Sequence, residues 1–185
     1  MDMHTQSTPS ARNTGLPIET MNVHALEPGT ELPLVVEPRK RRTVASLVDW
    51  LGDNHDWAQE RLRHHGAILF RGFAVDGAWD FERIARAVDP DLKNEYLGTS
   101  PRDGLTDYVF SASELPGYYP IPQHCEMSFL NSSPRHLFFN CMIAPDKGGE
   151  TPLVDFRKVW SDMRPEVRDR FVEGGFRIIR NYAGP

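Results

Sequence analysis

Apolar residues in the first half of the chain recur at spacings that alternate between helices and short strands. From Thr43 onward they repeat on one helical face, which predicts a packing helix with a break near 52–54. The apolar run 67–70 predicts a buried strand, and 76–88 carries a second amphipathic helical pattern. The run 32–36 ends at a Glu-Pro pair and suits an edge strand or an extended lead-in.

The second half of the chain has longer irregular stretches between its apolar segments. Residues 89–122 are loop-like, with a short candidate strand near 108–110. Residues 135–143 and 150–156 predict two strands that pair like a hairpin across a turn with two glycines. The segment 165–175 predicts a helix that begins at a proline and ends at paired glycines.

Composition and charge narrow the class of protein. Residues 1–30 are polar and without periodicity, so we expect a flexible tail followed by one domain over 31–185. A net charge of -5 argues against nucleic acid as the main partner, and we interpret the basic run 39–42 as a solvated linker. Two cysteines, no signal pattern and no run of eighteen apolar residues predict a cytoplasmic protein that does not span a membrane.

The stretch with the most specific chemistry is His124-Cys125-Glu126. In an extended backbone, alternate side chains point to the same face, so His124 and Glu126 would converge and Cys125 would face away as a buried thiol. One imidazole and one carboxylate are two of the three ligands of a facial iron(II) site. The tripeptide alone is a weak pattern, because a solvated histidine beside a glutamate explains it equally.

Four segments in register make the pattern more specific. They are 66–73 (GAILFRGF), 99–102 (TSPR), 121–129 (IPQHCEMSF) and 148–155 (GGETPLVD). Together these segments resemble the taurine dioxygenase family of iron(II) and 2-oxoglutarate-dependent oxygenases. Within the family they are most similar to the clavaminate synthase-like and syringomycin-type amino acid hydroxylase branch. The resemblance extends over roughly residues 32–182.

The resemblance implies a mixed α/β, mainly β fold: a double-stranded β-helix, or jelly roll, with flanking helices. It implies that His124 and Glu126 bind Fe(II) and that the Thr151 hydroxyl binds the carboxylate of 2-oxoglutarate, although Thr151 also suits an ordinary strand position. Arg102, Ser111 and Ser113 lie in segments that border the substrate pocket of relatives. Loop capping and surface charge explain these three equally well.

The implied reaction hydroxylates an unactivated carbon of an amino acid or related small molecule, either free or bound to a carrier protein. Molecular oxygen is the co-substrate, and 2-oxoglutarate loses carbon dioxide to become succinate. Related halogenases have a small residue at the position of Glu126 to make room for chloride. The resemblance therefore favours hydroxylation, with desaturation as the alternative, over halogenation.

The sequence departs from the family pattern after Thr151. Relatives supply a third ligand histidine and a 2-oxoglutarate-binding arginine there, whereas this chain has no later histidine, and Arg177 and Arg180 come too early. The jelly roll is therefore expected to be incomplete at its carboxyl end. A longer gene product or a second polypeptide would complete the site. The alternatives are a catalytically silent binding or scaffold module and a cupin-like enzyme that uses no 2-oxoacid.

Overall fold

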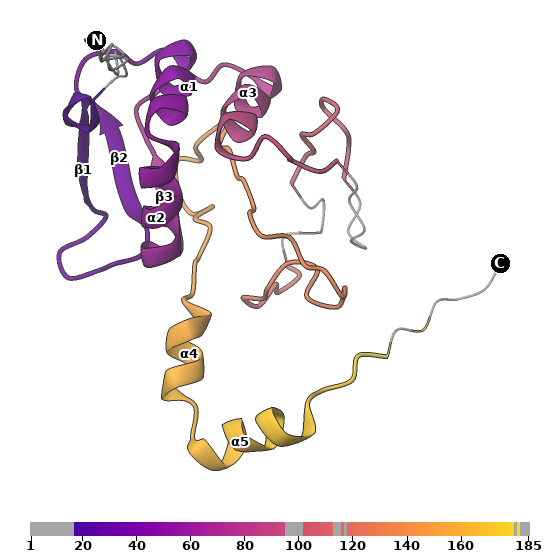
Figure 1. The fold of residues 1–185 in the computed structure, drawn as a ribbon. Coiled ribbons are helices and arrows are strands. Elements are labelled where there is room, and N and C mark those ends of the chain that lie inside the picture. Colours follow the sequence, from indigo (N-terminus) through magenta and orange to yellow (C-terminus); the bar gives the residue numbers. More distant parts are fainter. Residues whose placement is uncertain (1–16, 95–101, 113–115, 117, 180, 182–185) are drawn as a thin grey trace, which may run out of the picture.

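A three-stranded sheet forms one layer of the folded body (Figure 1). A computed structural model describes residues 17–94, 102–112, 116, 118–179 and 181. The sheet consists of β1 (Met21–Ala25), β2 (Leu34–Pro38) and β3 (Ile68–Phe70) in that order, preceded by the 3-10 turn η1 (Ile18–Thr20). β1 pairs antiparallel with β2, and β2 pairs parallel with β3.

Three helices pack near the sheet and agree with the apolar periodicity. α1 (Val44–Asp53) and α2 (His55–His65) connect β2 to its parallel neighbour β3, and α3 (Ala78–Val88) follows β3. The Thr43 hydroxyl accepts a hydrogen bond from the Ser46 N–H, so Thr43 caps α1 as predicted. The predicted break falls at Asn54, and the helix predicted near Asp76 begins at Ala78. The structure confirms these helices and the strand at 68–70.

The core lies between the sheet and α1, α2 and α3. Trp50 is fully buried, with its ring 5.4 Å from that of Trp57 and 6.4 Å from that of Phe70, both edge-on. Leu47 and Leu51 are 1% exposed on the same helix, and β2 contributes Val36. These side chains leave water together, which is the main source of stability for a body of this size.

Two expectations for the amino-terminal region were wrong. The predicted tail 1–30 is too long, because β1 pairs with β2 along its whole length and Met21 is buried in the core. β2 is the central strand rather than an edge strand, with Val35 and Val36 fully buried. Pro38 is tolerated because it ends β2, where no continuing ladder needs its missing N–H.

The described residues of the carboxyl-terminal half contain two helices and neither of the two predicted strands. α4 (Phe156–Asp162) and α5 (Pro165–Gly174) are its regular elements, and α5 matches the predicted helix. From residue 102 onward the described residues form no strand, so the hairpin over 135–143 and 150–156 is absent. An isolated antiparallel bridge joins Gly104 to Phe110 near the candidate strand at 108–110. A strand needs neighbouring backbone to pair with, and the described chain offers these segments none.

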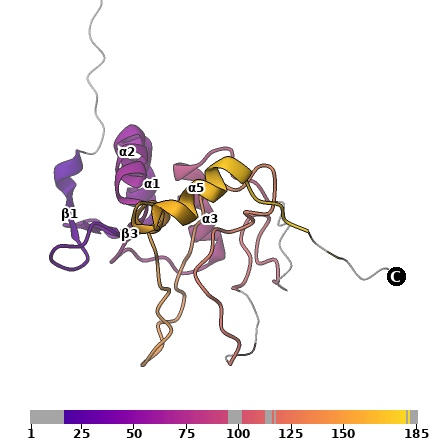
Figure 2. The same cartoon turned by 90° about the horizontal axis from the view of Figure 1, so that it is seen from below.

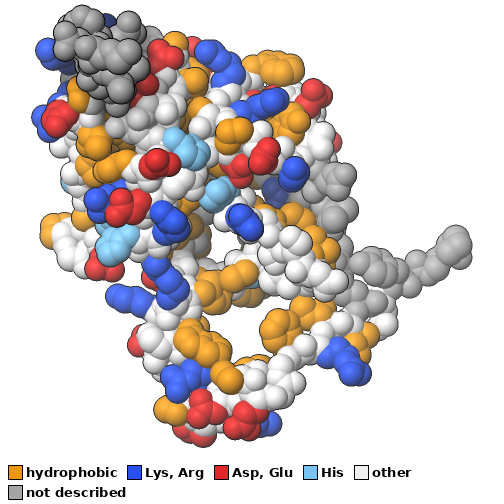
Figure 3. Space-filling view, viewed as in Figure 1, with side chains coloured by type: hydrophobic (Ala, Val, Ile, Leu, Met, Phe, Trp, Pro, Cys, Tyr) orange, Lys and Arg blue, Asp and Glu red, His pale blue; other side chains and the backbone are white. Residues whose placement is uncertain are grey.

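α4 and α5 form an arm that lies apart from the body in Figure 1 and in front of it in Figure 2, where the view is from below. None of their residues is buried. Figure 3 shows the arm separated from the body by openings, with hydrophobic side chains at its surface. Phe171 and Val172 are 49% and 66% exposed. The architecture is therefore mixed α/β, with a packed amino-terminal body and an open carboxyl-terminal half. No described helix combines the length and the apolar character needed to cross a membrane.

Replacing Gly52 by alanine is expected to stabilise the body by roughly 0.5–1 kcal/mol. Gly52 is exposed within α1, and a Cβ added there meets nothing within 4 Å, so the variant gains helix propensity without a clash. Gly66→Ala is the control and should destabilise the body instead, because Gly66 ends α2 with φ 78°, a conformation that strains alanine. Urea unfolding curves measure both effects. A Gly52→Ala chain less stable than the parent would contradict the helical assignment.

Candidate metal-binding site

His124 and Glu126 face each other in the structure. The Nε2 atom of His124 lies 3.5 Å from Oε2 of Glu126, and their side chains are 56% and 22% exposed. The two groups therefore converge, as the sequence predicts, at a surface that a ligand can reach. An imidazole nitrogen and a carboxylate oxygen are both good ligands for ferrous iron.

A backbone carbonyl orients the imidazole. Nδ1 of His124 lies 2.8 Å from the carbonyl oxygen of Pro122. A carbonyl oxygen can only accept a hydrogen bond, so Nδ1 carries the proton and donates it. In the neutral ring this leaves the lone pair on Nε2, the atom that faces Glu126. Histidines that bind metals are usually held by such a hydrogen bond from their other nitrogen.

The backbone around these residues differs from the extended strand that was expected. Glu126 begins a turn that runs to Phe129, and Met127 has φ 48°, a left-handed conformation uncommon for residues other than glycine. Such a conformation costs about 1–3 kcal/mol and is found most often at functional sites. Cys125 is exposed, so its assignment as a buried thiol was wrong.

A similar pair occurs in the body, which limits what geometry alone can identify. Nε2 of His24 lies 3.3 Å from Oε2 of Glu37, and Nδ1 of His24 lies 2.7 Å from the carbonyl oxygen of Ala25. The hydrogen bond to this carbonyl, followed by the one to Glu37, raises the pKa of His24 above its ordinary value. Two converging side chains therefore do not single out a metal site. The sequence segment around His124 is what distinguishes this pair from the pair His24 and Glu37.

The described residues bring together two candidate iron ligands but not a third. Across the described ranges, no group of three or more His, Cys, Asp or Glu side chains comes together in a way that could hold a metal. His136 is the nearest later histidine in the chain, and its Nδ1 lies 2.9 Å from Oδ2 of Asp89 at the end of α3. This contact engages Nδ1 of His136 with the end of α3. The donor types fit iron, and the set is incomplete.

Thr151 follows a turn whose backbone favours glycine at two positions. Gly148 and Gly149 have φ values of 75° and 80°, and a Cβ at Gly149 would lie 2.5 Å from Cγ of Pro145. Backbone conformation therefore favours both glycines of the GGET motif, and close approach to Pro145 adds a second reason at Gly149. The turn leads into Thr151, whose side chain is exposed. Its role in binding 2-oxoglutarate stays a prediction.

Two of the three predicted substrate residues, Arg102 and Ser111, lie in or beside one loop. The hydroxyl oxygen of Ser111 accepts a hydrogen bond from the Asp103 N–H at 2.9 Å, and the Ser111 N–H donates to the Asp103 carbonyl at 2.8 Å. Ser111 thus closes the loop, which agrees with its alternative interpretation as a capping residue. Arg102 is half-buried beside it, and Ser113 lies outside the described residues. Contact of these residues with a substrate stays a prediction.

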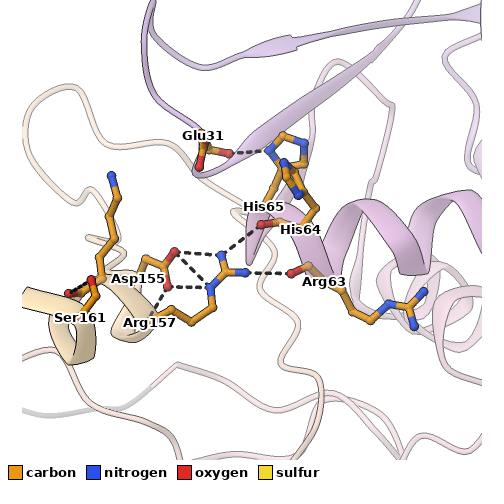
Figure 4. Close-up of polar contacts among 8 residues, drawn as sticks. Glu31, Arg63, His64, His65, Asp155, Arg157 and Ser161 are labelled. Carbon is orange, nitrogen blue, oxygen red and sulfur yellow. Dashed lines mark hydrogen bonds and ion pairs between the residues drawn. The ribbon is translucent and has the colours of Figure 1, made fainter.

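Sequence reasoning missed a polar cluster at the start of α4 (Figure 4). Asp155 caps this helix by accepting a hydrogen bond from the Arg157 N–H at 2.9 Å. The Asp155 carboxylate also accepts hydrogen bonds from Nε and Nη2 of Arg157, at 2.9 Å and 2.8 Å. An aspartate before the apolar positions of a helix is a capping signal that could have revealed α4. The strand prediction for 150–156 obscured that signal.

The pKa of Asp155 is expected to lie below 3.8 in solution, because the side chain of Arg157 donates hydrogen bonds to the carboxylate and the Arg157 N–H adds another. A carboxyl group whose pKa is lowered by folding stabilises the folded state at pH values above its pKa in the unfolded chain. That contribution is lost as the pH falls through the lowered pKa. NMR titration of the Asp155 carboxyl carbon measures the midpoint.

Arg157→Ala should move that midpoint upward, whereas Arg168→Ala should leave it unchanged. Arg168 lies on α5 and pairs with its neighbour Asp169, at 3.4 Å. Equal midpoints for Asp155 in the parent chain and in Arg157→Ala would show that the ion pair does not form in solution.

Comparison with known proteins assigns these segments to a family. The model of the Taurine catabolism dioxygenase TauD, TfdA family matches residues 27–184, which include His124, Glu126 and Thr151. A clavaminate synthase-like protein of Arabidopsis thaliana is 39% identical over 122 residues, covering 64% of this chain and 37% of its own length. The dapdiamide synthesis protein DdaC of Enterobacter agglomerans is 29% identical over 131 residues, covering 71% and 40%.

A more distant relative matches a similar share of this chain and of its own length. An alkylsulfatase of Acinetobacter baylyi is 25% identical over 129 residues, which cover 68% of this chain and 39% of that protein. The chain therefore spans about two fifths of the length of these curated relatives. The family match extends over most of the chain, from before β2 to beyond α5. The chain belongs to the Taurine catabolism dioxygenase TauD, TfdA family.

Proposed function

We propose that this chain is part of an iron(II) and 2-oxoglutarate-dependent dioxygenase that hydroxylates an amino acid or a related small molecule, either free or bound to a carrier protein. The observation that supports this proposal is the convergence of His124 Nε2 and the Glu126 carboxylate, 3.5 Å apart, within the segment matched by the family. The equivalent pair on the sheet, His24 and Glu37, lies partly before the matched range.

Each residue has a distinct task in this proposal. His124 would bind iron through Nε2 while the Pro122 carbonyl holds its other nitrogen, and Glu126 would bind through its carboxylate. The Thr151 hydroxyl would donate a hydrogen bond to a carboxylate of 2-oxoglutarate. When bound, iron and 2-oxoglutarate supply the activation of oxygen for C–H hydroxylation, with release of carbon dioxide and succinate. Glu126 fills the position that chloride would need, which favours hydroxylation, with desaturation as the alternative, over halogenation.

Further polypeptide would complete the site and the fold. Facial iron sites have a third ligand, which the described residues do not provide. We propose that additional residues, on the same polypeptide or on a second chain, supply this histidine, the 2-oxoglutarate-binding arginine and the remaining jelly-roll strands. The curated relatives are more than twice as long as the matched region, which supports this view. The composition supports a cytoplasmic location without a nucleic-acid partner.

Anaerobic addition of Fe(II) and then 2-oxoglutarate tests the proposed function. A chelate of 2-oxoglutarate on the bound iron should give a visible charge-transfer band that neither addition gives alone. The band should disappear in the double variant His124→Ala, Glu126→Ala. If the parent chain gives no band and the polypeptide that completes the site also gives none, the oxygenase proposal is wrong.

A second candidate function is a binding or scaffold module without catalysis. Two observations favour it: the ligand set is incomplete, and α4 and α5 have no buried residues. Exposed apolar helices of this kind suit contact with another protein. The same titration discriminates the two functions, because a scaffold module would bind neither Fe(II) at His124 nor 2-oxoglutarate.

A further inference from the structure

One arginine joins the arm to the body. Nη1 of Arg157 donates a hydrogen bond to the carbonyl oxygen of Arg63 at 2.9 Å, and Nη2 donates to that of His64 at 3.1 Å. Nε and Nη2 also donate to the carboxylate of Asp155 (Figure 4). Arg157 is therefore a junction between two segments that lie more than ninety residues apart in the sequence.

The partners of Arg157 explain why an arginine stands at this position. The carbonyls of Arg63 and His64 lie in the last turn of α2, where helical carbonyls lack partners within the helix and carry partial negative charge. A planar guanidinium has five donors in a fixed fork, so it can contact two carbonyls and a carboxylate at once. A Cβ at Gly66 would be in ordinary van der Waals contact with Nη2 of Arg157, 3.5 Å away, so the φ of 78° rather than this approach favours glycine there.

This junction fixes one end of the segment that carries Thr151. Asp155 is held by Arg157 and caps α4, so its backbone is tied to the carboxyl end of α2. Thr151 lies four residues earlier, and four residues span at most about 14 Å. The turn at Gly148 and Gly149 sets the local backbone conformation at the other end of the same segment. Thr151 therefore lies within that distance of a residue that is tied to α2.

We propose that Arg157 is a positioning residue for the 2-oxoglutarate site, because it fixes the segment 150–155 to the end of α2 and so sets where the Thr151 hydroxyl is presented. This inference rests on the proposed function, since it assigns Thr151 to 2-oxoglutarate. Arg157 itself contacts only protein groups here and lies on α4, outside the metal-binding pair.

Binding measurements on the 185-residue chain test this role with Mn(II), a redox-stable stand-in for Fe(II), and 2-oxoglutarate. In Arg157→Ala we expect an affinity for 2-oxoglutarate about tenfold weaker than in the parent, comparable to losing a group that orients a ligand. The affinity for Mn(II) at His124 and Glu126 should stay unchanged. A general loss of structure would weaken both together, so the ratio of the two affinities identifies positioning.

Two further variants complete the design. Arg157→Lys keeps the charge but loses the fork, so its affinity for 2-oxoglutarate should fall between those of the parent and Arg157→Ala. Arg168→Ala removes an arginine of α5 that pairs with its neighbour Asp169, and it should behave as the parent. Hydrogen–deuterium exchange of peptides covering 148–155 should rise in Arg157→Ala and remain at the parent level in Arg168→Ala.

The possible outcomes separate the inference from the proposed function. If the parent binds 2-oxoglutarate and Arg157→Ala binds it equally well, the inference is overturned and the proposed function stands. If the parent binds no 2-oxoglutarate in the presence of metal, either alone or with the polypeptide that completes the site, the proposed function fails, and the inference fails with it as a statement about that cofactor. In that case hydrogen–deuterium exchange still tests whether Arg157 restrains the segment 150–155. An exchange rate for peptides 148–155 that is the same in the parent and in Arg157→Ala overturns the restraint as well.

Discussion

Replacing His124 by alanine is expected to weaken the binding of Fe(II) on the order of a hundredfold, and Glu126→Ala should have a similar effect. Nε2 of His124 and the Glu126 carboxylate are the converging donors, 3.5 Å apart, and either one alone would leave the ion mostly bound to water. Anaerobic titration of the parent and both variants with Fe(II) measures the affinities. The double variant should lose little more affinity for Fe(II) than either single variant, because the two ligands act as a unit.

His24→Ala provides the matched control for this experiment. His24 is also exposed, with Nε2 3.3 Å from a glutamate and Nδ1 bonded to a backbone carbonyl. Its removal should leave the Fe(II) affinity unchanged, because the pair with Glu37 is a cross-strand contact between β1 and β2. A loss in His24→Ala equal to that in His124→Ala would contradict the assignment of the metal site.

Replacing Trp50 by alanine is expected to destabilise the body by about 3–5 kcal/mol. Trp50 is fully buried between Trp57 and Phe70, so the substitution removes the largest buried side chain of the core and leaves a cavity. A small domain has only about 5–15 kcal/mol of stability in total. The variant should therefore unfold at a much lower urea concentration, as measured by circular dichroism.

Trp79→Ala is the control for this substitution. Trp79 lies on α3 and is 65% exposed, so its removal should change the free energy of unfolding by less than about 0.5 kcal/mol. If Trp50→Ala unfolded at the same urea concentration as Trp79→Ala, the core described between the sheet and α1 would not exist in solution.

The helices could be predicted because the information that forms them is local. Apolar spacing, the cap at Thr43 and the left-handed Gly66 are all contained within a few residues of the elements that they define. The short strand β3 was predicted from its apolar run between glycines. β1 (MNVHA) was missed because its alternation of apolar and polar residues covers only five positions. Its pairing with β2 also depends on residues further along the chain.

The predicted hairpin failed for a different reason. Leu137 and Phe139 have the apolar character of a buried strand, yet they are 50% and 69% exposed. A strand that is apolar on both faces needs layers on both sides and partners for its backbone, and sequence pattern cannot show whether those are present. The chain spans about two fifths of its relatives. The jelly roll therefore remains a proposal for the complete protein.

The candidate site was only partly readable from sequence. The alternation of His124 and Glu126 predicted their convergence, although a turn at Met127 rather than a strand follows them. The junction at Arg157 could not be predicted, because it joins carbonyl groups that are more than ninety residues away. Backbone carbonyls carry no residue identity, so no motif in the sequence could have indicated this contact.

The most direct test of the account measures which residues surround the bound ion. Mn(II) replaces Fe(II), because both accept imidazole and carboxylate ligands and Mn(II) broadens the NMR signals of nearby nuclei. With 2-oxoglutarate present, the account predicts that the signals of His124, Glu126 and the Thr151 methyl group broaden together at the lowest Mn(II) concentrations. Broadening centred on other side chains, such as His24 and Glu37, with a sharp Thr151 signal would contradict it.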